Sequence, residues 1–427
     1  MENNSTRLIP HKMDHPHSAT DHHNTQEPFI ATVYATLPDD LVIWEILVRL
    51  PVKYLMLYKH IFPSWGAATA EAGFVRRHRD LSRVEPLSML VIPRKSSIQD
   101  ELELSEDISF HHLRVENTLG TIQNNEEVDL MLEKVCPPEE EGIANKIFPT
   151  HCNGLVCIAT NMDQVFVCNP ATRELVALPR GTPDVRDVKE PSAVLGFDAS
   201  RNQYVVARYF YQYFHNNTSS GVLSYEIGHE VFTLGGSSWE CTDEPPDAIG
   251  NTRPVFTRGA FYWGTYAPHD PQESMLVRFC LCKRSFDVVP SPPGFTHLCE
   301  VDYLADLNNK LCYVKNITEL NFVLWQLEDD GTRQPQWSPL CSINPLNEDL
   351  GVEAFFPVWA GWGGIIVLVD YEKLYWYEEK SGYMKELVDL EEEVDFERQR
   401  LHYGGNFYRS HVIPYMESLI SIRMCNY

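Results

Sequence analysis

The sequence has no apolar run long enough to cross a bilayer. Its longest apolar stretch, residues 354–369, contains Pro357 and three glycines, whereas a membrane helix needs about 20 apolar residues. We therefore expect two adjacent strands there and no membrane partner. The first two dozen residues are polar and lack the apolar segment of a secretory signal. The 11 cysteines are scattered, so we expect reduced thiols and a location in the nucleus, the cytoplasm or both.

Basic residues are scarce as well. The chain has 35 Lys and Arg against 60 Asp and Glu, a net charge of −25. Such a chain is repelled by the phosphates of nucleic acids and of anionic membranes. The densest basic run, residues 76–79, falls in a predicted helix, where a solvated helix face explains it. We expect no nucleic-acid partner.

Motifs of common catalytic and cofactor sites are also missing. Residues 361–364 are rich in glycine but lack the Lys-Ser/Thr of a phosphate-binding loop, and there is no nucleophile elbow. Two close cysteine pairs, Cys152 with Cys157 and Cys280 with Cys282, lack the second pair that a zinc site requires. We expect no catalytic residue, no metal and no cofactor.

One catalytic alternative stays open, because some β-propellers are glycosidases. Paired carboxylates in a central channel would serve that chemistry. Turn positions explain the candidate residues more simply. The candidates are Asp198, Asp302, Asp306 and Asp370.

Turn-forming and aromatic residues are what the sequence has in quantity: 28 Pro, 23 Gly, 20 Tyr, 20 Phe and 9 Trp. In residues 85–425, short runs of alternating character such as 203–208 and 261–263 are separated by Gly, Pro, Asn and Asp turns. This pattern predicts a mainly β domain, either a sandwich, a barrel or a propeller. Glycine-rich or asparagine-rich turns followed by aromatic strands recur and favour a propeller. At ~45–50 residues per blade, the length predicts roughly six or seven blades.

The N-terminal part differs in character. Residues 1–35 are too polar to bury a core, and we expect a disordered tail. Residues 36–82 predict a small all-α module. Pro38 and the acidic pair after it suit a helix start, and Pro51 and Pro63 punctuate the helices that follow. So small a module gains stability from a partner or from the domain behind it.

Residues 37–78 resemble the F-box. The matching segments are Leu37-Pro38-Asp39-Asp40-Leu41, Glu45-Ile46-Leu47, Arg49-Leu50-Pro51-Val52-Lys53, Leu55, Ser64-Trp65, Phe74-Val75-Arg76 and His78. The departures are Leu57, Pro63 and Gly66, where that family usually has basic residues, and Phe62, where it often has Cys.

The rest of the chain is similar to the F-box-associated domain of plant F-box proteins. The segments that carry this likeness include 152–157, 169–174 with Leu178-Pro179, 196–198 with 204–206, 237–239, 259–263 and 415–421. Within them, we expect the Asn169-Pro170-Ala171-Thr172-Arg173 segment to be a structural turn.

The resemblance implies a non-catalytic substrate receptor of an SCF-type (cullin-RING) ubiquitin ligase. The F-box would bind a Skp-type adaptor and, through it, the cullin, while the β domain recruits a target protein for ubiquitination. Apolar anchors at helical spacing suit such recognition of a helix in a groove. The expected adaptor-binding residues are Leu37, Pro38, Leu41, Ile46, Leu47, Leu50, Pro51, Val52 and Leu55. Each of these residues also fits a place in the core of the module.

The target-binding residues are unknown at this stage. The aromatic run at residues 209–215 suits either an interface or a buried strand. The alternative function is a propeller scaffold or ligand sensor, outside any ligase, with a degenerate F-box.

Overall fold

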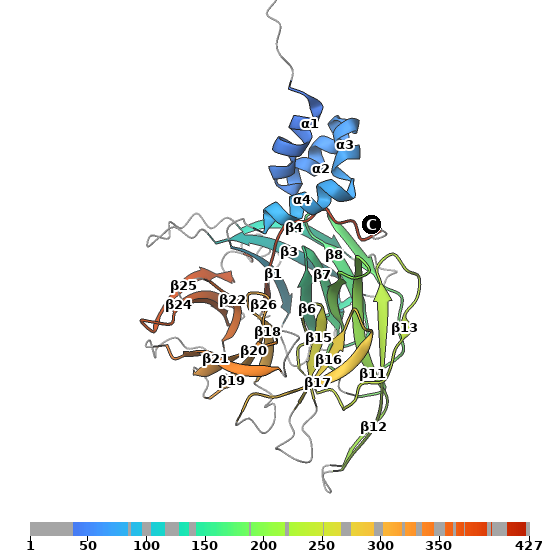
Figure 1. The fold of residues 1–427 in the computed structure, drawn as a ribbon, viewed down its shortest axis with the longest axis vertical. Helices are drawn as coiled ribbons and strands as arrows, with labels where there is room; N and C mark the ends of the chain where they lie inside the picture. Colours follow the sequence, from blue (N-terminus) through green and yellow to red (C-terminus); the bar gives the residue numbers. More distant parts are fainter. Residues whose placement is uncertain are drawn as a thin grey trace, which may run out of the picture. The chain divides into compact units, whose positions relative to one another are not determined.

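The computed structural model describes residues 37–83, 87–95, 104–115, 128–135, 142–187, 189–217, 222–250, 252–265, 275–293, 302–317, 321–329, 335–345, 355–361, 364–370, 372–390, 394 and 408–423. The predicted N-terminal tail, residues 1–35, lies outside them. From Asp40 onward the chain forms one compact unit. In Figure 1 the helices of this unit lie together at one end and the sheets at the other. No helix among the described residues has the length and apolarity that a membrane crossing requires.

The helical module follows the proline punctuation of the sequence. Its elements are α1 (Asp39–Leu41), a π-helical stretch η1 (Val42–Ile46), a 3-10 turn η2 (Leu47–Arg49), α2 (Val52–Ile61), α3 (Pro63–Thr69) and α4 (Ala72–Ser82). Pro51 separates η2 from α2, and Pro63 occupies the first turn of α3, where its missing N–H costs nothing. A cluster of Leu47, Val48, Leu55 and Phe74 forms the core of the module.

The sheets form six four-stranded antiparallel blades, within the predicted range of six or seven. In spatial order from the centre outward, blade 1 has β26 (Tyr408–Pro414), β1 (Ser88–Lys95), β3 (Asp107–Arg114) and β4 (Val128–Val135); blade 2 has β6 (Ile147–Cys152), β7 (Leu155–Thr160), β8 (Val165–Asn169) and β9 (Glu174–Ala177); blade 3 has β10 (Val194–Asp198), β11 (Gln203–Asn217), β12 (Val222–Thr233) and β13 (Glu240–Cys241). Blade 4 has β14 (Val255–Thr257), β15 (Ala260–Gly264), β16 (Met275–Cys280) and β17 (Ser285–Pro290); blade 5 has β18 (Tyr303–Asp306), β19 (Leu311–Asn316), β20 (Phe322–Glu328) and β21 (Gln336–Ile343); blade 6 has β22 (Phe356–Ala360), β23 (Ile365–Val369), β24 (Lys373–Glu378) and β25 (Tyr383–Asp389). A short pair, β2 (Leu104–Ser105) and β5 (Ile143–Ala144), stands apart from the blades.

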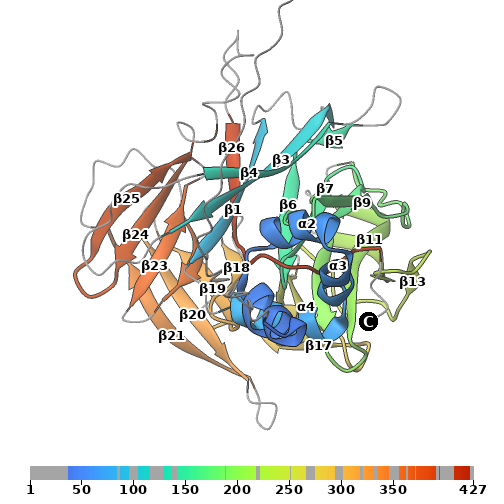
Figure 2. The ribbon, with the colours of Figure 1, turned by 90° about the horizontal axis from the view of Figure 1, so that it is seen from above.

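The two ends of the propeller meet in blade 1. The last strand, β26, pairs antiparallel with β1, from Met89 opposite Pro414 to Lys95 opposite Tyr408. The innermost strands β6, β10, β14, β18, β22 and β26 then contact one another in a closed ring. Figure 2, which looks onto the helices, shows the sheets arranged around the centre of this ring.

The strands settle one expectation from the sequence. The apolar stretch 354–369 does contain two adjacent strands, β22 and β23, which pair antiparallel. Two further strands, β3 and β4, lie between residues 96 and 146 and complete blade 1.

Each junction between neighbouring blades encloses a hydrophobic cluster of its own. Successive side chains of a strand point to opposite faces of its sheet. Val194 therefore joins the cluster between blades 3 and 4, while its neighbour Leu195 joins the cluster between blades 2 and 3. Leu90 and Val91 divide in the same way between the two junctions of blade 1. The core is thus a ring of six interfaces.

The predicted turn at Asn169 fastens the C-terminal segment to blade 2. The fully buried Asn169 side chain accepts hydrogen bonds from the backbone N–H groups of Ala171 and Thr172 through Oδ1. Its Nδ2 donates to the backbone oxygens of Ser418 (2.9 Å) and Ile420 (2.7 Å). The structural role expected of this asparagine is therefore confirmed.

We predict that Asn169→Ala lowers the free energy of unfolding by about 2–4 kcal/mol, because buried backbone groups lose their partners at both ends of the amide. Urea unfolding measures this change. Gln212→Ala, which removes an exposed amide side chain, is the control and should change the stability by less than about 0.5 kcal/mol. Equal effects of the two substitutions would contradict the role of Asn169.

The propeller should also lose stability in mild acid. Burial lowers the pKa of His112 and of His151 to about 4 and the pKa of His229 to about 3, whereas an unfolded histidine has a pKa of about 6.5. Below about pH 6.5 the unfolded state therefore binds more protons than the folded state, and stability falls toward pH 4 by about 1.4 kcal/mol per pH unit for each histidine. Asp306 acts in the opposite direction, since burial raises its pKa to about 7, but the three histidines outnumber it. Urea midpoints at pH 7.0 and pH 5.0 test this, and a midpoint that rises at pH 5.0 would refute it.

Candidate functional site

The helical module exposes large apolar side chains at its surface. Leu37 is 60% exposed, and Leu41 and Ile46 are also exposed, although each suits a protein interior. On α2, Leu57 and Ile61 are 56% and 57% exposed. Exposed apolar groups gathered on one small module indicate a surface that binds a partner.

The nine predicted adaptor-binding residues divide into three groups. Leu37, Pro38, Leu41 and Ile46 are exposed, and Leu50 and Pro51 are half-buried. The other three, Leu47, Val52 and Leu55, are at most 2% exposed and lie inside the module. In this structure the buried three support the surface from within, and the exposed and half-buried six are available for contact.

Sequence reasoning missed the outer face of α2. Tyr54, Leu57 and Ile61 recur at spacings of three and four, which puts them on one face of a helix, and all three are exposed. Val52 and Leu55 occupy the inner face of the same helix. The sequence did carry a signal for this face, since apolar residues occur on both sides of α2. A helix that is apolar all round is normally covered by other parts of the protein or by a partner.

Three of the four departures from the F-box pattern, Leu57, Pro63 and Gly66, fit the local structure. Gly66 lets α3 approach α2 closely, because a Cβ at this position would lie 3.1 Å from the backbone oxygen of Lys59. Pro63 begins α3, and Leu57 adds to the exposed apolar face of α2. None of the three interrupts the helices.

The module is also less acidic than the chain as a whole. Between Leu37 and Arg83 there are seven Lys and Arg against five Asp and Glu, a net charge of +2, within a chain of net charge −25. Exposed Glu45 pairs with Arg49 and with Arg77, at 3.0 and 3.2 Å. The hydrogen bond from Arg49 lowers the pKa of the Glu45 carboxyl. The excess lies after residue 62: residues 37–62, which carry the exposed apolar side chains, hold three Lys and Arg and three Asp and Glu.

The module is joined to the propeller by the segment after β26. The backbone N–H of Val52, in the first turn of α2, donates to Oε2 of Glu417 at 2.7 Å. Leu419 packs against the module core and also against the cluster between blades 2 and 3. At the end of α4, Arg83 donates from Nη2 to Oδ1 of Asn153 at 2.7 Å. The helical surface is thereby held in one position relative to the blades.

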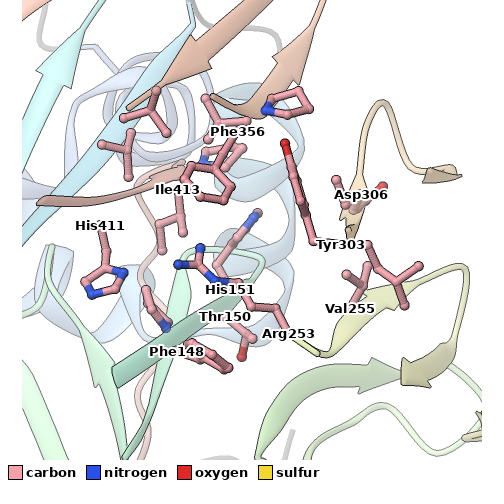
Figure 3. A pocket seen from close by; sticks show the side chains of 18 of the residues that line it. Phe148, Thr150, His151, Arg253, Val255, Tyr303, Asp306, Phe356, His411 and Ile413 are labelled. Carbon is pink, nitrogen blue, oxygen red and sulfur yellow. The ribbon is translucent and has the colours of Figure 1, made fainter. Parts of the chain in front are cut away.

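A second candidate site is the centre of the propeller. A cavity of about 140 Å³ is lined by residues of β6, β14, β18, β22 and β26, by Val369 of β23 and by residues just before β14; Figure 3 shows side chains that line it. A neighbouring cavity of about 320 Å³ is lined by Ser82 and Arg83 together with His151 and Asp306, which also line the first. The second cavity therefore marks the helix-side mouth of the channel.

The four candidate carboxylates do not assemble there. Asp306 lines both cavities, but Asp198, Asp302 and Asp370 line neither. These three instead hold local structure: Asp198 accepts from Arg201 (2.7 Å), Asp302 from Lys315 (2.7 Å) and Asp370 from the N–H of Lys373 (2.6 Å). The carboxylate pair that glycoside hydrolysis requires is not formed by these residues.

Thiols and metal ligands form no site in the part of the chain that the structure describes. No group of three or more His, Cys, Asp or Glu is arranged to hold a metal ion there. The described cysteines are free, and Cys280 and Cys282 approach to 3.3 Å between sulfurs. Burial raises the pKa of Cys152 and of Cys157 to about 12, which suits structural thiols.

Comparison with known proteins agrees with this arrangement. The model of the family described as "F-box associated beta propeller domain" matches residues 114–376, more than half of the chain. The chain is 26% identical over 412 residues to F-box protein At5g10340 of Arabidopsis thaliana, covering 90% of this chain and 84% of that one. It is 24% identical over 348 residues to F-box protein At1g30790 of the same plant, covering 78% and 82%. Another Arabidopsis thaliana relative, F-box/LRR-repeat/kelch-repeat protein At1g09650, is 26% identical over 320 residues, covering 72% and 77%.

We predict that Glu417→Ala loosens α2 without unfolding the propeller, because an acidic side chain bound to the N–H groups of a helix start stabilises the helix by about 0.5–2 kcal/mol. Hydrogen exchange should show α2 amides opening about 2- to 30-fold more often, with blade amides nearly unchanged. Glu240→Ala, at an exposed position of β13, is the matched control. Unchanged exchange in α2 would refute the coupling.

Proposed function

We propose that this chain, which belongs to the family of proteins with an F-box-associated β-propeller domain, is the substrate-recognition subunit of an SCF-type ubiquitin ligase. Its helical module binds a Skp-type adaptor and, through the adaptor, a cullin. Its propeller binds a target protein. The observation that carries the proposal is the exposed apolar surface of a module whose own core is already complete.

The proposed mechanism is positional and needs no catalytic residue in this chain. A receptor that holds its target near the ubiquitin carrier raises the local concentration of the target's lysines. That effect requires a fixed geometry between the adaptor-binding surface and the propeller. The contacts of Glu417 and Leu419 with the helical module supply such rigidity.

The adaptor contact follows from the chemistry of the surface. Burying Leu41, Ile46 and Leu57 in an apolar groove removes apolar area from water, at about 25 cal/mol per Å². Residues 37–62 carry no net charge within a chain of net charge −25, so the apolar side chains, and not an excess of charge, would carry the affinity for the adaptor. We also propose a location in the nucleus, the cytoplasm or both.

A pull-down and titration with recombinant Skp-type adaptor tests the proposal. We expect the full chain to bind, and Leu41→Ala/Ile46→Ala to weaken binding about 10- to 100-fold, because each truncation at an interface centre costs about 1 kcal/mol or more. Both side chains are exposed, so the variant should keep its urea midpoint. Val185→Ala/Tyr383→Ala, which truncates two exposed apolar residues of the propeller, is the matched control.

The same titration examines the face of α2 that the sequence did not single out. Leu57→Ala/Ile61→Ala should weaken binding if the adaptor covers that face, and should be neutral if it does not. Failure of the folded wild-type chain to bind any Skp-type adaptor would end the receptor proposal and favour the propeller scaffold or ligand sensor. Continued turnover of a target after residues 37–80 are deleted would have the same consequence.

A further inference from the structure

The channel cavity described above is built from segments far apart in the sequence. Phe148 and His151 come from β6, Arg253 from the residues before β14, Phe356 from β22 and His411 from β26. Its volume of about 140 Å³ is close to that of a cavity that holds one benzene molecule, about 150 Å³. The space therefore suits one compact organic group, either a small molecule or the end residue of a longer chain.

The cavity gathers basic side chains in an acidic protein. The Arg253 guanidinium lies 5.1 Å from the ring centre of Phe148 and 5.5 Å from that of Phe356. Figure 3 shows it between these two rings, with His151 and His411 beside it. Among the described lining residues, Asp306 is the one carboxyl group. Asp306 is the last residue of β18 and lies at the helix-side mouth of the channel. Arg253 stands shortly before the first residue of β14, at the other end of the channel.

The electrostatics of these groups favour a negative occupant. Burial, together with the positive charges of Arg253, Arg94 and Arg409, holds the pKa of His411 well below its usual value. Burial likewise lowers the pKa of His151 to about 4, and it raises the pKa of Asp306 to about 7. Near neutral pH both histidines are therefore uncharged and Asp306 is about half protonated. Arg253 then carries the permanent charge of the cavity wall.

We propose that the central channel is a binding site for a carboxylate that carries a compact apolar body. The planar guanidinium of Arg253 matches a carboxylate in a two-point hydrogen bond. Phe148, Phe356 and Ile413 supply apolar contacts for the attached body. A single guanidinium with neutral histidines suits a monoanion better than a phosphate dianion, which calls for a cluster of cations. The site is separate from the helical surface, so it stands whether or not the adaptor binds.

Carboxylates reach such a site from two sources, a free organic acid or the carboxyl terminus of a polypeptide. Benzoate is the probe for the first, and its neutral isostere benzamide is the matched control ligand. A short peptide ending in phenylalanine, with a free or an amidated terminus, is the probe for the second. Tighter binding of the free-terminus peptide than of benzoate would identify a polypeptide end as the natural occupant. Tighter binding of benzoate would identify a free acid.

Calorimetric titration of the full chain tests the proposal. We expect benzoate to bind at least tenfold more tightly than benzamide, and Arg253→Gln to weaken benzoate binding at least tenfold. Arg253→Lys keeps the charge without the planar fork, so it should give an intermediate loss and serves if the Gln variant does not fold. Lys380→Gln removes one exposed positive charge of blade 6 and should leave binding unchanged. Equal binding of benzoate and benzamide, undiminished binding in both Arg253 variants, or no binding of either carboxylate probe would overturn the proposal.

Discussion

The pairing of β26 with β1 is the constraint on which the rest of the structure depends. A propeller is a closed ring, and here the last strand supplies the innermost position of the first blade. Without it, β6 and β22 lose the neighbour that completes the ring, and the clusters on both sides of blade 1 open to water. Closure joins segments more than 300 residues apart, from Met89 to Pro414. Contacts of such long range carry a loop-closure entropy cost, which slows folding.

The residues that follow β26 connect the closed ring to the helices. Ser418 and Ile420 are held by Asn169 of blade 2, and Glu417 and Leu419 reach the helical module. Gly154 leaves the room for this segment, since a Cβ there would lie 2.6 Å from the backbone oxygen of Met416. One stretch of nine residues, 415–423, therefore couples ring closure to the orientation of the proposed adaptor surface.

The protein presents two chemically different regions that this framework keeps apart. The helical surface is apolar and carries no net charge over residues 37–62, which suits association with another folded protein. The channel is small and partly polar, and its fixed charge is an arginine held between aromatic rings. The chain has a net charge of −25, so the positive field of Arg253 is local. Arg253 lies at the channel because the inner strands converge there. The nearby helix-side cavity, lined by Ser82 and Arg83, places one end of the channel beside the last helix.

Local features could be predicted from the sequence because interactions between residues close in the sequence produce them. Pro51 and Pro63 divided the helices, Asn169 specified a turn, and alternating aromatic runs predicted β-strands. Tertiary structure decided the number of blades, the inclusion of β3 and β4 in blade 1 and which face of each helix is buried. The F-box pattern did not separate buried Leu47 from exposed Leu41, since both are apolar and only packing distinguishes them. The approach of Arg253, His151 and His411 likewise has no sequence signal, because it arises when distant inner strands close into one ring.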